Sequence, residues 1–311
     1  MSNQTIQNPA QPLVLALGTF DGVHLGHQAL VAQAASLAKK LRARLAVFTF
    51  TDLPGKLLNR PTARLCSIEE QERLLLRAGA DRVDRVEFTP AFASLTPEEF
   101  FSFLQERYLL VGLAAGFNYT FGKFGAGSAQ TLQELGRERG IAVEIAEPVL
   151  FGAEPISSTR IRARISEGDM PGAAALLGRP YTLSGRVVAH RQVGRKLGFP
   201  TANIEPGDLL LPLDGVYAST VTLENATYAA VTNVGTNPTF GQGERTVETY
   251  ILNEQLSLYT KKISVSLHRR LRGETAFASP QELSKQIGRD VEAAKKLFVS
   301  DRKGVYNAKG L

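Results

Sequence analysis

The sequence predicts two domains of different class, a doubly wound parallel α/β sheet followed by an antiparallel β-barrel or sandwich. The chain has 311 residues, which is enough for two hydrophobic cores. Up to about residue 150, short apolar runs alternate with amphipathic stretches, a rhythm that is typical of βαβ units. After Gly178, runs rich in Val, Thr and Tyr follow one another between Gly, Pro and Asn turns, which indicates antiparallel strands.

The first domain is expected to hold strands over residues 13–17, 45–50, 83–88, 113–117 and 142–145. A helix follows the first strand, because apolar residues between Leu30 and Leu41 form one stripe. Ser67 and Thr96 begin the next two helices as N-caps, each with a Glu three residues later. A helix over 131–138, which ends at Gly140, completes the expected doubly wound sheet.

The second domain is expected to hold strands over residues 182–189, 215–223, 228–234, 246–252 and 263–267. One helix follows over 280–298, with an apolar stripe along one side. We expect this helix to plug or cover the barrel. We expect residues 1–178 to form the first domain, 179–183 a linker, 184–300 the second domain and 301–311 a loosely held tail.

The composition is that of an ordinary globular protein, with 43% hydrophobic and 21% charged residues. No apolar stretch is long enough to span a bilayer, and the polar N-terminus lacks the layout of a signal peptide. The lone Cys66 excludes an internal disulfide and a cysteine-based zinc site. The net charge of +6 suits anionic ligands such as nucleotides, whereas scattered cationic residues and the absence of Trp argue against nucleic acid. We therefore expect a cytoplasmic protein, a monomer or weak homo-oligomer, with no membrane or nucleic-acid partner.

Residues 18–27, directly after the first strand, combine three glycines with two histidines at a strand-to-helix turn. Gly18, Gly22 and Gly26 let the backbone approach a ligand closely. His24 and His27 are three residues apart, so a helix that starts here puts both imidazoles on one face. The helix N-terminus adds N–H groups and a positive dipole end, which favour phosphate. The same histidines can instead form a surface pair or half of a metal site.

Two further segments, 116–122 and 156–162, follow strands of the first domain. Ligands of open α/β sheets bind beyond the carboxyl ends of the strands. In the second segment, three hydroxyl side chains stand at a helix start with two arginines just inside it, a set that fits pyrophosphate or a triphosphate tail. These residues are Ser157, Ser158, Thr159, Arg160 and Arg162. They can equally cap the helix while the arginines stay in solvent.

In the second domain, residues 194–203 join a glycine-bounded basic turn, which begins with Gly194 and Arg195, to Thr201 and Asn203. Oxygen ligands of this kind suit Mg²⁺ shared with phosphates. Glu248, on the strand over 246–252, is either a residue of the exposed face or a functional acid or base. The sequence contains no Walker A motif, Gly-x-Ser-x-Gly elbow, His-Glu-x-x-His helix or Cys-x-x-Cys pair, which excludes a P-loop kinase, an elbow hydrolase and an obvious zinc enzyme.

Together these segments resemble the bifunctional prokaryotic riboflavin kinase/FAD synthetases, in the same order from about Leu13 to Phe298. Residues 18–27 carry the His-x-Gly-His signature that is shared with nucleotidyltransferases that attack ATP at its α-phosphate. The other matching motifs are 116–122 and 156–162 in the first domain, and 198–203 with 215–217 and 233–240 with 247–248 in the second. The resemblance implies a nucleotidyltransferase domain followed by a riboflavin kinase β-barrel with a C-terminal helix.

The resemblance also implies two ATP- and Mg²⁺-dependent steps: riboflavin and ATP give FMN and ADP, and FMN and ATP then give FAD and pyrophosphate. It implies that His24 and His27 hold ATP phosphates and that Asn118 orients the α-phosphate or its metal. Nucleotide binding is carried over to Gly18, Phe20, Asp21, Gly22 and Gly26. Stabilisation of pyrophosphate is carried over to Ser157, Ser158, Thr159, Arg160 and Arg162.

In the second domain, the resemblance implies that Gly194 and Arg195 contact the nucleotide and that Thr201 and Asn203 bind Mg²⁺-ATP. The resemblance also implies that Glu248 accepts the proton of the ribityl 5′-hydroxyl.

Two segments depart from the family's pattern. Only Phe50 and Pro54 remain of a Phe-x-Pro-His-Pro motif, and His190 stands where a glycine is expected. These departures leave two alternatives: an enzyme that retains one of the two activities, or a regulator that binds flavin or nucleotide without turnover.

Overall fold

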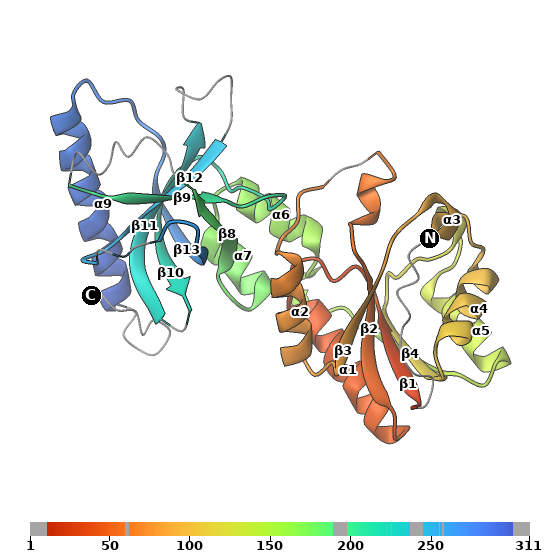
Figure 1. Cartoon of the computed structure of the whole chain (residues 1–311). Helices are drawn as coiled ribbons and strands as arrows, with labels where there is room; N and C mark the ends of the chain where they lie inside the picture. The colour runs from red at the N-terminus through yellow and green to blue at the C-terminus, as the bar shows by residue number, and fades with distance from the viewer. Residues whose placement is uncertain are drawn as a thin grey trace. The chain divides into compact units, whose positions relative to one another are not determined.

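The computed structural model describes residues 11–59, 62–188, 198–224, 226–236, 245–254, 256 and 258–300. The chain divides into two compact units, Met1–Ser157 and Ser158–Leu311, which are described one at a time (Figure 1). Across these described ranges, no helix is long and apolar enough to cross a membrane.

The first unit is built on a parallel sheet whose described part has five strands in the order β3-β2-β1-β4-β5. The strands are β1 (Leu13–Leu17), β2 (Arg44–Phe50), β3 (Arg82–Val86), β4 (Leu110–Gly116) and β5 (Ala142–Ala146). They confirm the strands predicted for this domain, with small shifts at their ends. All residues of β1 are apolar and buried, as a central strand covered on both faces requires.

Helices cover both faces of this sheet, which confirms the doubly wound class. Leu13 and Leu15 of β1 lie in one core with α4 (Pro97–Arg107) and α5 (Ala129–Glu138), whereas Val14 and Ala16 lie in another with α1 (Leu25–Lys40) and α2 (Ile68–Arg77). Successive strand residues point to opposite faces, so one apolar run serves two cores. Figure 1 shows α4 and α5 on one side of the sheet and α1 and α2 on the other.

The predicted helix caps are present. Ser67 Oγ accepts a hydrogen bond from Glu70 N at 3.2 Å, and Thr96 forms a reciprocal capping box with Glu99. The sequence pattern missed several short elements: α3 (Pro90–Ala93), the 3-10 turns η1 (Pro54–Lys56) and η2 (Lys123–Gly125), and the hairpin of β6 (Leu150–Phe151) and β7 (Glu154–Pro155). Such elements are too short to show a periodic pattern.

The second unit contains a closed antiparallel barrel, so the sandwich alternative is excluded. In the part of this unit that the structure describes, the order around the barrel is β10-β11-β12-β9-β8-β13. The strands are β8 (Tyr181–Val188), β9 (Thr201–Glu205), β10 (Gly215–Leu223), β11 (Ala226–Thr236), β12 (Arg245–Ile251) and β13 (Lys262–Arg272). The sequence pattern predicted all of these except β9, which pairs with β12 and β8.

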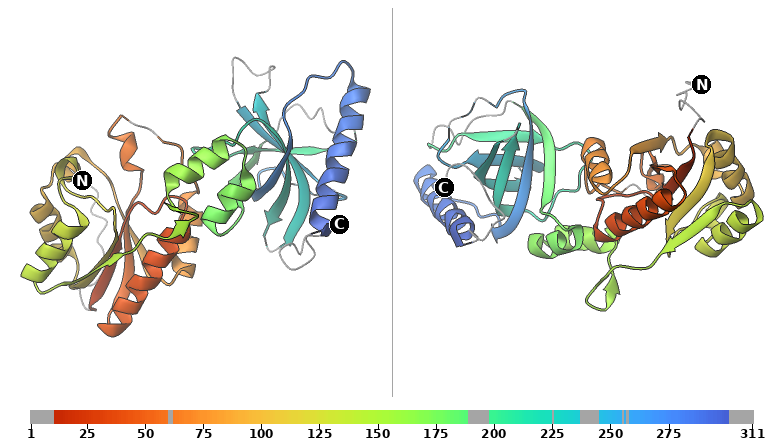
Figure 2. Two further views of the ribbon diagram at one scale, coloured as in Figure 1. Left: turned by 180° about the vertical axis from the view of Figure 1, so that it is seen from behind. Right: turned by 90° about the horizontal axis from the view of Figure 1, so that it is seen from below.

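Helix α9 (Pro280–Ser300) covers one side of the barrel rather than filling it (Figure 2). Val291, Ala294 and Phe298 pack against apolar side chains of β10 and β11. The buried carboxylate of Asp290 pairs with Arg272, at the end of β13, at 2.9 Å. The helix is therefore held by both apolar packing and a buried ion pair.

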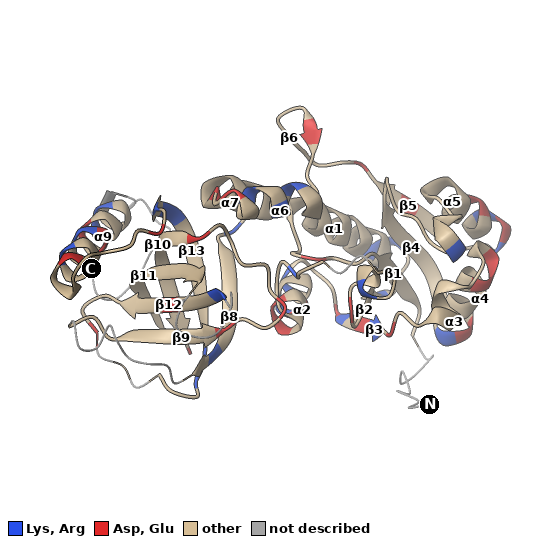
Figure 3. Ribbon diagram, turned by 90° about the horizontal axis from the view of Figure 1, so that it is seen from above, with Lys and Arg blue, Asp and Glu red and all other residues tan. Residues whose placement is uncertain are grey.

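Helices α6 (Ser158–Ser166) and α7 (Met170–Leu177) belong to the second unit, so the compact units divide upstream of the boundary expected after residue 178. The physical reason is contact with the barrel, because Leu213 N donates to Ile165 O at 3.2 Å and Gly168 lies against the Arg270 side chain. Strand β8 begins at Tyr181, inside the expected linker 179–183. Figure 3 shows basic residues along α6.

Candidate functional site

The strand order places the first candidate site at the switch point of the parallel sheet. β1 pairs with β2 on one side and with β4 on the other. Loops that follow two such strands diverge, and ligands of doubly wound sheets bind there. Residues 18–24 follow β1 and residues 117–122 follow β4, so two of the predicted segments meet this condition.

The turn after β1 has an unusual backbone, with φ of 50° at Phe20, 78° at Gly22 and 39° at Val23. Only glycine adopts this left-handed region without steric cost. Phe20 and Val23 are fully buried in the core shared with α1. Burial of these two side chains therefore holds the turn in a shape that its backbone alone disfavours.

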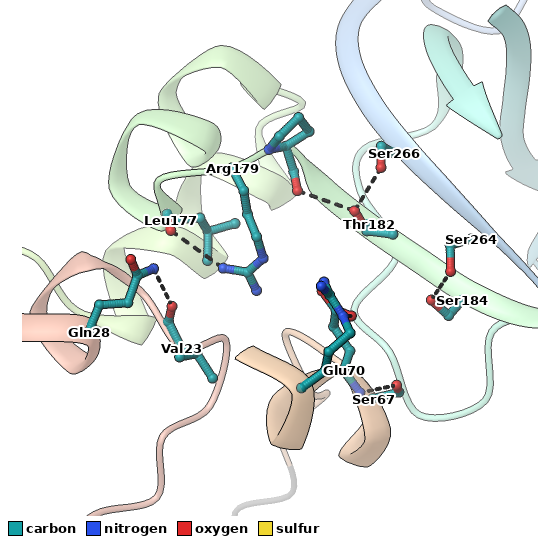
Figure 4. A network of polar contacts seen from close by, with 12 residues as sticks. Val23, Gln28, Ser67, Glu70, Leu177, Arg179, Thr182, Ser184, Ser264 and Ser266 are labelled. Atoms are coloured by element: carbon teal, nitrogen blue, oxygen red, sulfur yellow. Dashed lines mark hydrogen bonds and ion pairs between the residues drawn. The ribbon is translucent and has the colours of Figure 1, made fainter. Parts of the chain in front are cut away.

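Polar contacts fix the same turn. Asp21 is buried, and its Oδ1 accepts from the backbone N of Leu65 at 2.9 Å. Gln28 Nε2 donates to Val23 O at 2.9 Å (Figure 4). The side chains of Phe20 and Asp21 thus shape the turn, and a ligand contact at these positions would come from the backbone.

His24 is the N-cap of α1, and its Nδ1 accepts from the backbone N of His27 at 3.3 Å. The two imidazoles stack, with ring centroids 3.6 Å apart and planes inclined by 17°. A Cβ on Gly26 would stand 3.2 Å from the His24 ring, so this position favours glycine. The structure brings the two predicted histidines together at the positive end of the α1 dipole.

The protonation of this pair follows from its surroundings. Burial, and then the neighbouring His24, hold the pKa of His27 well below its ordinary value of 6.5, so His27 is neutral at neutral pH. Because His24 Nδ1 accepts a hydrogen bond, a neutral His24 carries its proton on Nε2. Neutral imidazoles can each donate one N–H to a phosphate oxygen. Among the described residues, no group of three or more His, Cys, Asp and Glu can hold a metal ion, so the metal-site alternative finds no further ligands there.

Asn118 is an exposed residue at the start of the loop after β4. Its Oδ1 lies 3.4 Å from the place that a Cβ on Gly116 would occupy. Phe117 N donates to Ala146 O at 3.1 Å, and Tyr119 N donates to Gly116 O at 3.0 Å. The backbone on both sides of Asn118 is therefore fixed while its amide stays accessible.

The segment 156–162 crosses the division between the two units. In the first unit, Ile156 O lies 3.9 Å from the position of a Cβ on Gly26, so Ser157 directly follows a residue beside the start of α1. In the second unit, α6 begins at Ser158, as the hydroxyl cluster predicts. Its first turns carry Thr159, Arg160 and Arg162.

The segment 50–54, which departs from the family's pattern, ends β2 and enters η1. Asp52 forms ion pairs with Lys56 at 3.3 Å and with Arg64 at 3.5 Å. Arg64 is buried and also donates to Thr51 O. Ion pairs of Asp52 therefore hold this segment, in which Asp52 and Leu53 stand in place of the expected proline and histidine while Pro54 remains.

In the second unit, Asn203, Glu248 and Asn233 form one row across three strands. Glu248 on β12 is the register partner of Asn203 on β9 and of Asn233 on β11. Directly opposed residues of antiparallel strands share a face, with Cβ atoms about 4.5–5.5 Å apart. Val231, two residues before Asn233, packs against α9, so the row lies on the outer face of the barrel. Glu248 is half-buried between two amides and is not a simple surface carboxylate.

Thr201 and the aromatic pair of Phe199 and Tyr250 extend this row. Thr201 opposes Tyr250 across β9 and β12. The rings of Phe199 and Tyr250 meet edge to face, with centroids 5.3 Å apart. Asn203 is 7% exposed, and its buried Oδ1 has no hydrogen-bond partner in the described part of the chain. An orphaned buried oxygen is costly and a cation would satisfy it, so Thr201 and Asn203 fit Mg²⁺.

Several residues of this face received no role from the sequence. A Cβ on Gly235 would overlap the Glu274 carboxylate, which therefore lies on the backbone of β11. Asn233 and Tyr250 join the site through strand register, and Phe199 joins it through its ring contact with Tyr250. Asn233 and Phe199 lie in the matching segments 233–240 and 198–203, but the sequence pattern assigned neither of them a role. Gly194 and Arg195, together with His190, lie outside the described residues.

Comparison with known proteins agrees with a two-site chain. A model of FAD synthetase matches residues 6–160, and a model of riboflavin kinase matches residues 177–298. The bifunctional riboflavin kinase/FMN adenylyltransferase of Escherichia coli (strain K12) is 36% identical over 94% of this chain and 95% of its own length. The enzyme of the same description from Bacillus subtilis (strain 168) is 33% identical over 93% of this chain and 94% of its own length.

Among solved structures, one described as a macrolide-efflux protein from Streptococcus pneumoniae matches with a TM-score of 0.86 and 34% identity. It covers 95% of this chain and 97% of its own chain. The resemblance that the motifs indicated is thus confirmed over nearly the whole sequence. The chain belongs to the family of bifunctional riboflavin kinase/FMN adenylyltransferases.

Proposed function

We propose that this chain makes FAD from riboflavin in two ATP-dependent steps, as its family does, with one site for each step. The observation that supports this most directly is that each unit holds its own polar site. One site stacks His24 on His27 at a helix N-terminus, which suits phosphate charge. The other aligns Glu248 between Asn203 and Asn233, which suits proton transfer beside a nucleotide.

In the adenylylation step, an oxygen of the FMN phosphate attacks the α-phosphate of ATP. A new P–O bond forms, and the bond from the α-phosphorus to the bridging oxygen of the β-phosphate breaks, which releases pyrophosphate. The FMN phosphate is already ionised and needs no strong base. His24 and His27 donate hydrogen bonds to phosphate oxygens as negative charge moves toward pyrophosphate.

Other residues of this step act by binding. Gly18, Gly22 and Gly26 let the backbone approach the nucleotide, and Asn118 orients the α-phosphate. The departing pyrophosphate is bound by Ser157, Ser158, Thr159, Arg160 and Arg162. We propose that this functional domain comprises residues 1–178, as the change of sequence pattern after Gly178 indicates, and thus extends beyond the first compact unit.

In the kinase step, Glu248 takes the proton of the ribityl 5′-hydroxyl as that oxygen attacks the γ-phosphate, and ADP leaves. Thr201 and Asn203 hold Mg²⁺, which neutralises phosphate charge when it is bound. Asn233 orients the Glu248 carboxylate from the opposite strand. Gly194 and Arg195 contact the nucleotide. We also propose that the enzyme works in the cytoplasm on flavins and ATP, as a monomer or weak homo-oligomer, without nucleic-acid or membrane partners.

Flavin chromatography tests this proposal. The purified chain is incubated with ATP and Mg²⁺, with riboflavin in one tube and FMN in the other. FAD in both tubes supports the two-step function. FAD from FMN alone points to a kinase disabled at the His190 loop, and FMN that accumulates without FAD points to a failure at the altered segment 50–54. No product in either tube favours a binding regulator.

A further inference from the structure

Gln71 is a buried residue of α2 that holds the turn after β1 from behind. Its side chain is 2% exposed. Its Nε2 donates to Thr19 O at 3.0 Å and to Phe20 O at 3.2 Å. A single amide therefore binds two successive carbonyls of the segment that carries the proposed phosphate contacts.

Neighbouring groups reinforce this arrangement. Thr49 Oγ1, which is also fully buried, donates to the same Thr19 O at 3.1 Å. On the other side of the amide, Arg85 Nη2 donates to Gln71 Oε1 at 3.4 Å. The arginine fixes which end of the amide faces the turn, because Oε1 accepts from the cation and Nε2 is left to donate to the carbonyls.

The carbonyls of Thr19 and Phe20 matter because they are the negative ends of peptide dipoles next to a site for phosphate. Gln71 and Thr49 draw them toward the protein interior, and the N–H end of α1 then dominates the field on the ligand side. Phe20 lies at φ 50° and Val23 at φ 39°, conformations that persist only when surrounding contacts impose them. Without the amide, Phe20 O keeps the bond from Val23 N but loses its side-chain donor.

We propose that Gln71 is a positioning residue for the adenylylation step, which sets the phosphate-binding shape of residues 19–23 without touching substrate. This inference rests on the proposed function of the first unit. The central variant is Gln71→Met, which keeps the length of the side chain and removes the donor. Gln133→Met, on the exposed side of α5, is the matched control.

Steady-state kinetics of FAD formation from FMN gives the readout. Gln71→Met is expected to raise the KM for ATP by about tenfold to a hundredfold while the KM for FMN stays within twofold of the wild type, since misplacement of about 1 Å has effects of this size. The riboflavin kinase activity of the same chain stays unchanged and serves as an internal control. Unaltered ATP kinetics in Gln71→Met, or a lower Tm as its only effect, would overturn the proposal.

Two further measurements keep the test decisive. If Gln71→Met does not fold, Thr49→Val is used instead, because it removes the second donor to Thr19 O and is expected to raise the KM for ATP. Thr49→Ser keeps the hydroxyl and is expected to have the KM of the wild type. Equal ATP kinetics in these two variants would then contradict the proposal. If the wild type makes no FAD, the proposed function fails independently of the role of Gln71. In that case ATP is titrated into the wild type and into Gln71→Met. The imidazole NMR signals of His24 and His27 then report the ATP affinity of each phosphate site. Equal ATP affinities of the wild type and Gln71→Met would contradict the positioning role.

Discussion

His24 and His27 stack ring on ring at 3.6 Å, and Gly26 between them leaves no Cβ to disturb the stack. The N-cap bond from the backbone N of His27 to His24 Nδ1 holds the His24 ring at the start of the helix. Local helix formation thus sets the spacing of the two imidazole donors, and the glycine is part of the site although it has no side chain. The first prediction follows from this contact.

Gly26→Ala would place a methyl group 3.2 Å from the His24 ring, so the ring must shift by a few tenths of an ångström relative to His27. We expect FAD formation from FMN to fall by up to about tenfold, because the donors move by less than the 1 Å that costs about a hundredfold. Tm is measured in parallel, so that a loss of stability is distinguished from a loss of phosphate binding. Gly288→Ala in α9 is the matched control, since its Cβ meets nothing within 4 Å. Wild-type FAD formation in Gly26→Ala would show that the stack is not needed.

Glu248→Gln keeps the shape of the row on the barrel but removes the proton acceptor. We expect riboflavin phosphorylation to fall by about a hundredfold to ten-thousandfold, the usual contribution of a general base. FAD formation from supplied FMN is measured in parallel and stays at the wild-type rate. Glu205→Gln, an exposed carboxylate on β9, controls for loss of charge alone. If Glu248→Gln phosphorylates riboflavin normally, Glu248 is a structural residue.

Asn203→Ala removes the buried oxygen that lacks a partner among the described residues. The Mg²⁺ concentration that gives half-maximal kinase activity is expected to rise about tenfold, an effect typical of weakened metal ligation. Asn203→Asp restores an oxygen ligand and brings the Mg²⁺ requirement back toward that of the wild type. A Mg²⁺ dependence that is the same in all three proteins would place the metal elsewhere.

Strong local patterns predicted most of the fold. The uninterrupted apolar run of β1 fits a central strand and little else, and the Ser67 and Thr96 caps mark helix starts by themselves. β9 was not predicted, because its Thr-Ala-Asn-Ile-Glu sequence becomes a strand only through pairing with β8 and β12. The grouping of α6 with the barrel likewise depends on a distant contact, from Leu213 N to Ile165 O.

The candidate sites divide in the same way. His24 and His27 could be predicted because their motif is contiguous, and the structure brings their rings together. Gln71 could not be predicted as a partner of the turn, because it lies 52 residues from Thr19 in the sequence. The pattern of its helix indicates which apolar residues are buried but not which polar side chain binds the turn. Asn233 lies in a segment that matched the family's pattern, but its position beside Glu248 follows only from strand register. Contiguous motifs can thus be found in a sequence, whereas the residues that support them belong to the tertiary fold.

His268 gives the second unit a pH-dependent stability. Its Nε2 lies 2.9 Å from Thr220 Oγ1 and its ring meets Phe298 of α9 edge to face, and burial lowers its pKa from 6.5 to about 4. Between these pH values the unfolded chain binds a proton that the folded chain does not, so acid favours unfolding. This contribution is fully present above pH 6.5 and is lost as the pH falls toward 4. Calorimetry of the wild type and His268→Gln is expected to show Tm curves that converge as the pH is lowered from 7 to 5, because only the wild type loses this term. Parallel curves for the two proteins would mean that His268 titrates alike in the folded and unfolded states.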